Sequence, residues 1–137
     1  MWFTPNHFTL CNSLRLLGLE PRFEVGDVVA RGFADLGFEE FQVLPGPRIL
    51  SLTAGTVKPL PDDHREHFFW IPSADEVVSL IEQSGATINE CFREDCRDWR
   101  IVVQISSGKA FTVSARSIHE TLLRALIELY SVEKEQS

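Results

Sequence analysis

Residues 73–85 read Ser-Ala-Asp-Glu-Val-Val-Ser-Leu-Ile-Glu-Gln-Ser-Gly, and this stretch carries the clearest structural signal in the chain. Pro72 ends the extended run before it, and Ser73 with Glu76 forms a capping box, in which each side chain accepts a hydrogen bond from the backbone N–H of the other residue. Apolar residues then recur at helical spacing, and the final glycine suits the left-handed residue that follows a helix. The stretch predicts a helix over about residues 74–84.

A second helix is predicted near the C-terminus, over residues 117–131. Ser117 and Glu120 repeat the capping box, and the apolar residues after them recur every three or four positions, as in an amphipathic helix that faces a core. These apolar residues are Leu122, Leu123, Leu126, Ile127, Leu129 and Tyr130. The polar tail, residues 133–137, is expected to be frayed.

Three short segments rich in β-branched and aromatic residues lie between the two predicted helices. They are residues 87–92, 99–105 and 109–114. The pair Ser107-Gly108 is typical of a tight antiparallel hairpin, because glycine accepts a positive φ without steric cost. The second half of the chain therefore predicts the order helix, strand, strand, strand, helix.

The N-terminal half is expected to be mainly β. Its strand candidates are residues 23–25, 28–33, 38–44, 48–57 and 66–71, and turn-forming residues divide them. Residues 59–64, Pro-Leu-Pro-Asp-Asp-His, are the clearest loop. Residues 14–19 could form one short helical turn, and residues 1–20 as a whole are interpreted as an arm or a poorly ordered segment.

These elements predict an α+β fold, a mostly antiparallel sheet with both helices packed on one of its faces. A parallel α/β fold is disfavoured because strands and helices do not alternate. With 137 residues and no linker-like stretch, we expect a single domain over residues 1–137.

Composition narrows the class of protein. The chain is 44% hydrophobic and 24% charged, with a formal net charge of −7 and no run of basic residues. We therefore expect no binding to nucleic acid, which depends on clustered Lys and Arg. We also expect no membrane segment and no targeting signal, which predicts a cytoplasmic protein. Three cysteines, an odd number, favour reduced thiols over a disulfide framework.

One resemblance spans roughly residues 66–130. The motifs that carry it are Phe68–Ser73 before a short helix, then Trp99–Val103, then an aromatic strand that runs into Ile118–Leu126. This pattern resembles the small proteins of phages and prophages described as phage α-β-α sandwich domains. The resemblance implies an accessory or interaction domain from a bacterial or phage genome, and it brings no catalytic residues with it.

Four side chains could in principle bind Zn²⁺, namely His64, His67, Cys91 and Cys96. Structural zinc sites place two cysteines two to four residues apart on a tight turn, often with glycine. Here four residues, none of them glycine, separate the cysteines. We therefore expect no metal and no cofactor, with Cys91 buried in a strand and Cys96 exposed in a loop.

Catalytic candidates are few. Cys96 has three arginines nearby but also three acidic residues, which oppose a lowered thiol pKa. His119 falls at the second position of the last helix, where a neutral surface or capping role is favoured over general base catalysis. Asp62, Asp63 and His64 form an acid–base cluster in a loop of the kind that is usually polar for solubility alone. No residue is assigned a catalytic role, and an enzyme is disfavoured.

The aromatic residues suggest a different function. Phe68, Phe69 and Trp70 follow one another on one predicted strand, so they occupy both faces of the sheet. Either one face contacts a protein partner or a second copy of the chain, or the N-terminal segment folds over it. We hypothesise an interaction or accessory module that uses Phe68, Trp70 and Trp99. The alternative is a small enzyme or a ligand- or metal-binding protein that uses residues 62–67 with His119 or Cys96.

Overall fold

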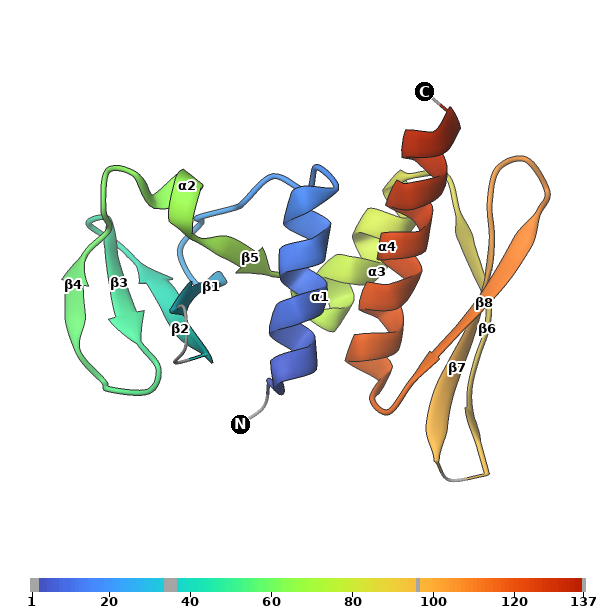
Figure 1. Cartoon of the computed structure of the whole chain (residues 1–137), viewed down its shortest axis with the longest axis horizontal. Helices are drawn as coiled ribbons and strands as arrows, with labels where there is room; N and C mark the ends of the chain where they lie inside the picture. The colour runs from blue at the N-terminus through green and yellow to red at the C-terminus, as the bar shows by residue number, and fades with distance from the viewer. Residues whose placement is uncertain (1–2, 34–36, 96, 137) are drawn as a thin grey trace. The chain divides into compact units, whose positions relative to one another are not determined.

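The computed structural model describes residues 3–33, 37–95 and 97–136, and it shows a mixed α+β chain in which strands predominate over helices in number (Figure 1). The chain divides into two compact units, Met1–Pro72 and Ser73–Ser137, each of which is described by itself. The predicted α+β class is confirmed. The strands, however, form two separate antiparallel sheets, where the sequence led us to expect one. The assignment of the whole chain to a single domain stays a prediction.

The N-terminal unit holds a five-stranded sheet in the order β4-β3-β2-β1-β5, with every neighbouring pair antiparallel. Its elements are α1 (Pro5–Leu16), β1 (Val28–Phe33), β2 (Gly37–Leu44), β3 (Arg48–Ser51), β4 (Val57–Pro59), α2 (His64–His67) and β5 (Phe69–Ile71). The first four strands form a meander, and the chain then returns through α2 so that β5 pairs with β1.

Helix α1 corrects the expectation of an arm with one helical turn at residues 14–19. Thr4 is the N-cap, Pro5 starts the helix, and the Thr4 backbone N–H donates to Nδ1 of His7 at 3.0 Å. Histidine thus occupies the position that glutamate holds in the usual capping box, and for this reason the signal was missed. The buried residues form one face of the helix, and they are His7, Phe8, Cys11 and Leu14.

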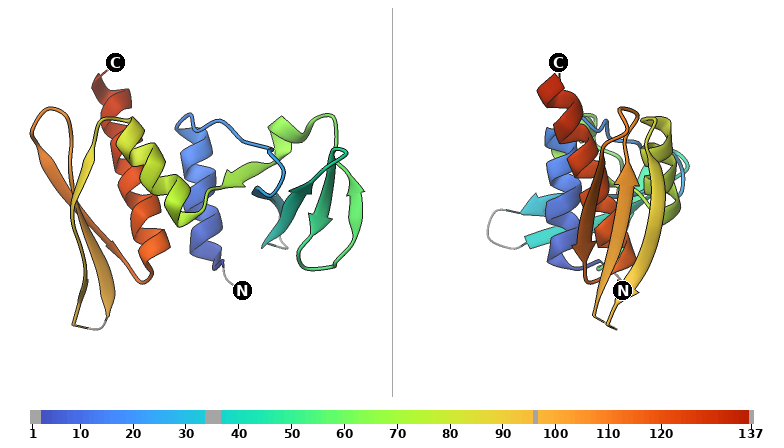
Figure 2. Two further views of the ribbon diagram at one scale, coloured as in Figure 1. Left: turned by 180° about the vertical axis from the view of Figure 1, so that it is seen from behind. Right: turned by 90° about the vertical axis from the view of Figure 1, so that its right-hand side faces the viewer.

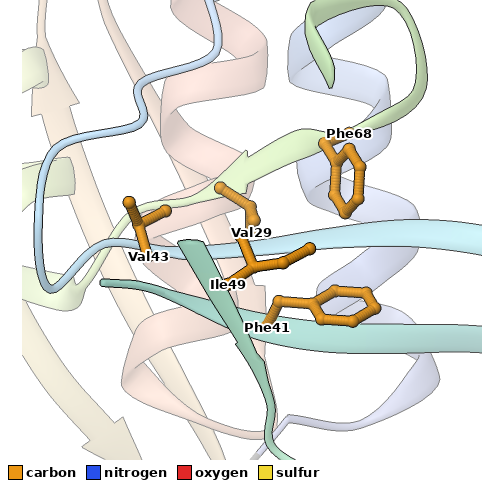
Figure 3. Packing of buried hydrophobic residues seen from close by; sticks show 5 residues of the cluster. All are labelled: Val29, Phe41, Val43, Ile49 and Phe68. Carbon is orange, nitrogen blue, oxygen red and sulfur yellow. The ribbon is translucent and has the colours of Figure 1, made fainter. Parts of the chain in front are cut away.

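Side chains pack on both faces of the five-stranded sheet. On one face, four buried strand residues cluster with Phe68 (Figure 3). Phe23 and Leu60 pack against this cluster. The strand residues of this cluster are Val29, Phe41, Val43 and Ile49. On the other face, Phe38 stacks on Phe8 of α1 with ring centroids 5.0 Å apart and meets Phe69 edge-on at 5.9 Å.

Three predicted strands of this unit differ in extent. Residues 23–25 form no strand. The strand predicted over residues 48–57 ends at Ser51, and β4 begins only at Val57, because Ser51 and Gly55 close a turn in which the Ser51 Oγ accepts the Ala54 N–H at 3.1 Å. The strand predicted over residues 66–71 spans only Phe69–Ile71, because the residues before it form the single helical turn α2.

The C-terminal unit has the predicted order helix, strand, strand, strand, helix. Its elements are α3 (Ala74–Gln83), β6 (Thr87–Glu94), β7 (Asp98–Gln104), β8 (Ala110–Ala115) and α4 (Ile118–Gln136). Both capping boxes begin where they were predicted: the Ser73 Oγ accepts the Glu76 N–H at 3.2 Å, and the Ser117 Oγ accepts the Glu120 N–H at 3.1 Å. Helix α4 continues past its predicted end at residue 131, since no glycine or proline interrupts it. The predicted fraying of the tail stays untested.

The three strands form a sheet in the order β6-β7-β8, and both helices lie on one side of it (Figures 1 and 2). Helix α4 packs on β7 and β8, while α3 packs mainly on α4. The core therefore joins Ile101 and Val103 of β7 to the apolar stripe of α4. The buried residues of that stripe are Leu122, Leu123, Ala125, Leu126 and Leu129.

An ion pair between the half-buried Arg22 and the buried Asp27 holds the segment before β1. The Asp27 carboxylate is only 7% exposed, and it accepts two hydrogen bonds from the Arg22 guanidinium, at 2.9 and 2.8 Å, and one from the Glu24 N–H at 2.9 Å. The same guanidinium lies over the Trp70 ring, 4.5 Å from its centroid. These hydrogen bonds offset the cost of removing the Asp27 carboxylate from water.

We predict that Asp27→Ala lowers the free energy of unfolding by about 1–3 kcal/mol, because it removes three hydrogen bonds to a charged acceptor and leaves Arg22 without this partner. Urea denaturation followed by tryptophan fluorescence measures the change. Asp62→Ala, at an exposed loop position, is the matched control and is expected to change stability by less than about 0.5 kcal/mol. Equal losses in the two variants would contradict the role given to Asp27.

Candidate functional site

The segment that carried most of the predicted site residues forms the turn before β5 and the short helix α2. His67 Nε2 lies 3.0 Å from Oδ2 of Asp63, one helical turn earlier. His64 Nδ1 lies 2.7 Å from the Pro61 carbonyl oxygen, to which it donates, and its ring meets Phe23 edge-on with centroids 4.4 Å apart. His64 is therefore held by packing and a backbone hydrogen bond, while Asp62, Asp63 and His67 are exposed.

Among the described residues, one group of side chains that could bind a metal ion lies close together. It consists of Asp63, Glu66 and His67. One potential ligand atom from each residue lies within 4.8 Å of the others, and all three residues are exposed. The predicted set does not coincide with this group. His64 and His67 belong to the N-terminal unit, Cys91 belongs to the C-terminal unit, and Cys96 lies outside the described residues. Three exposed groups on one helical turn are weaker than the closed four-ligand arrangement typical of structural zinc.

We predict that the purified chain retains far less than one equivalent of zinc after dialysis, because the exposed Asp63, Glu66 and His67 compete poorly with water for the ion. Elemental analysis by mass spectrometry measures the metal content. One molar equivalent that survives dialysis, and that is lost in His67→Ala but not in the neighbouring Arg65→Ala, would contradict this expectation.

The two cysteines that the structure describes have opposite environments. Cys11 is 1% exposed in α1, and burial raises the pKa of its thiol to about 12. Cys91 is exposed on β6, which corrects the expectation that it would be buried. Its side chain lies on the face of the sheet that the helices cover, because Cys91 pairs directly with the buried Ile101. It stays accessible because α4 packs mainly on β7 and β8.

We predict that a maleimide modifies Cys91 rapidly in the folded Cys96→Ser variant, while Cys11 reacts only after denaturation. The physical reason is that burial both blocks access to Cys11 and disfavours its thiolate, the form that reacts. Intact-mass spectrometry after timed labelling should show one adduct in buffer and two in denaturant. Equal labelling rates for the two thiols in buffer would contradict this description.

The remaining catalytic candidate, His119, is the second residue of α4, as predicted, and is half-buried. It belongs to the C-terminal unit, whereas residues 62–67 belong to the N-terminal unit. The C-terminal unit has one hollow of about 60 Å³ and another of about 460 Å³, and none of the predicted catalytic residues lines either of them.

The aromatic residues predicted to form an interaction surface lie mostly in the core. Phe68 is fully buried and Trp70 is 6% exposed, so neither presents a surface to a partner. The N-terminal segment covers the strand instead, through the contacts of Phe38 with α1 and with Phe69. Trp99 is half-buried on β7, and its predicted role stays untested.

The structure draws attention to β6, which was not singled out from the sequence. It is an edge strand, and every residue of it except Ile88 is exposed. Phe92 is 41% exposed on the outer face, where it pairs with Arg100 of β7. A β-bulge lies between Ile88 and Glu90. The sequence signal for an edge strand was present, since charged residues occur on both faces of residues 90–94.

An open groove of about 460 Å³ runs beside the start of β6. It lies between α3, which contributes Val78 and Glu82, and the first residues of β6, which contribute Thr87 and Ile88. Val78 and Ile88 are half-buried apolar residues, and Glu82 is exposed. An extended chain laid along β6 would therefore meet backbone hydrogen-bonding groups on the strand and apolar side chains in the groove.

No family model, curated protein or solved structure matches this chain. Within the described ranges, no helix combines the length and the apolar composition needed to cross a membrane.

Proposed function

We propose that this chain is a cytoplasmic, non-enzymatic interaction module that binds an extended segment of a partner protein along β6. The observation that carries the proposal is the open edge of the C-terminal sheet, where an eight-residue strand pairs with β7 on one side only. An edge strand offers a row of backbone N–H and C=O groups that an added strand can satisfy. Such pairing gives affinity without any catalytic residue.

The groove beside β6 supports the same proposal because side-chain pockets give an added strand its specificity. Alternate residues of a bound segment would point toward Val78 and Ile88, and a basic residue among them would meet Glu82. The exposed Phe92 offers apolar area on the opposite face. An accessory role of the kind implied by the resemblance to phage α-β-α sandwich domains belongs to this proposal, since that resemblance includes all of β6.

The alternative function, an enzyme or metal-binding protein centred on residues 62–67, is supported only by the exposed group Asp63, Glu66 and His67. Exposed acidic groups are common without a ligand, and all three residues of this group are exposed. The open edge is therefore the stronger basis for a function.

We predict that peptides selected on the full chain from a library of random twelve-residue sequences bind in extended form along β6. Hydrogen exchange with a selected peptide should slow specifically at the β6 amides, because the peptide occupies their free side. Phe92→Lys should weaken binding at least tenfold by placing a charge on the edge that the peptide covers.

Thr112→Lys is the matched control, since Thr112 is exposed on the outer face of the same sheet but lies on β8. It should leave peptide affinity unchanged. Selected peptides that protect other amides, or that bind both lysine variants equally, would contradict the proposal.

A further inference from the structure

The residues of β6 place strict limits on how this edge can pair with itself. A sheet that continues across a two-fold axis is antiparallel, and residues directly opposite each other share a face. The axis must therefore pass through one residue of β6, which then faces its own copy. Near the middle of the strand, the choices are Glu90, Cys91 and Phe92.

The three registers differ in which charged side chains they place opposite each other. An axis at Glu90 places that carboxylate opposite itself, and an axis at Phe92 places Glu90 opposite Glu94 of the second copy. Like charges directly opposite each other destabilise a strand pair. An axis at Cys91 places Glu90 opposite Phe92 and brings Arg93 to the bulge at Asn89, so that no carboxylate faces another.

The Cys91 register also brings an unpaired cation to an unpaired anion. Arg93 pairs with Trp99 across β7, so its side chain lies on the face that the helices cover, which is the side of the groove. In this register Arg93 of the second copy reaches the bulge, where the Asn89 side chain donates to Gln104 on the outer face and leaves the helix-covered face free. There Arg93 lies next to Ile88, which lines the groove together with Glu82. Neither Arg93 nor Glu82 has an ion-pair partner among the described residues of its own chain.

We infer that β6 pairs with β6 of a second copy about a two-fold axis at Cys91, with a Glu82–Arg93 ion pair at each end of the added strand. This inference rests on the proposed use of the β6 edge and names its partner. The Phe92 side chains of the two copies are then diagonal neighbours on the outer face, within reach of each other, which accounts for an exposed aromatic residue on that strand.

The ion pair is tested by exchanging its charges. Sedimentation equilibrium of the full chain should show a concentration-dependent dimer, and Arg93→Glu or Glu82→Arg alone should weaken it at least tenfold. The double variant should recover most of the lost affinity, because it restores opposite charges in the reversed order. Arg124→Glu, the same charge change at an exposed position of α4, is the control and should dimerise as the parent chain does.

The register is tested at Cys91. In the Cys96→Ser variant, a short bismaleimide should link two chains through Cys91 in high yield, since opposite residues of paired strands are close and Cys11 is buried. The yield should fall in Arg93→Glu and recover in the double variant. A monomer at every concentration, or a dimer that neither charge reversal weakens, would overturn the inference.

The peptide selection distinguishes that failure from failure of the proposed function. A monomer that still binds selected peptides along β6 loses only the second copy as its partner. If the chain is a monomer and no selected peptide binds through β6, the proposed function is wrong as well.

Discussion

The packing of α4 on β7 and β8 is the interaction on which the C-terminal unit depends. A helix with its side chains is about 10 Å wide and strands lie about 5 Å apart, so one helix covers about two strands. Helix α3 packs mainly on α4 and leaves β6 exposed at nearly every residue. The exposure of the β6 side chains therefore follows from the position of α4 over β7 and β8, while its open edge follows from the absence of a strand beyond it in the described sheet.

In the N-terminal unit, by contrast with the exposed strand β6, most of the aromatic residues pack against other side chains. Its sheet has short edge strands, each of three residues, and both of its faces are packed. Phe8 of α1 covers Phe38 on one face, and Phe68 completes the cluster of Val29, Phe41, Val43 and Ile49 on the other. The aromatic richness of the chain is thus used largely for its own core, and the exposed apolar area relevant to binding is small and local.

The sequence predicted those helices best in which a capping box is followed by apolar residues at helical spacing. Ser73 and Ser117 began their helices as predicted, because capping boxes and apolar stripes act within a few residues. Helix α1 was missed because His7 replaces the usual acidic partner and polar residues interrupt its stripe. The division into two sheets and the exposure of Cys91 depend on contacts between segments distant in sequence, and no local pattern reports these.

The β-bulge between Ile88 and Glu90 limits how many further strands can add to the β6 edge. A regular, flat edge of eight residues can recruit identical strands one after another, which is how ordered fibrils grow. The bulge adds one residue and a local twist, so that only a short regular run, from Glu90 to Glu94, remains available. The strand can thus accept one well-matched neighbour while it resists indefinite stacking.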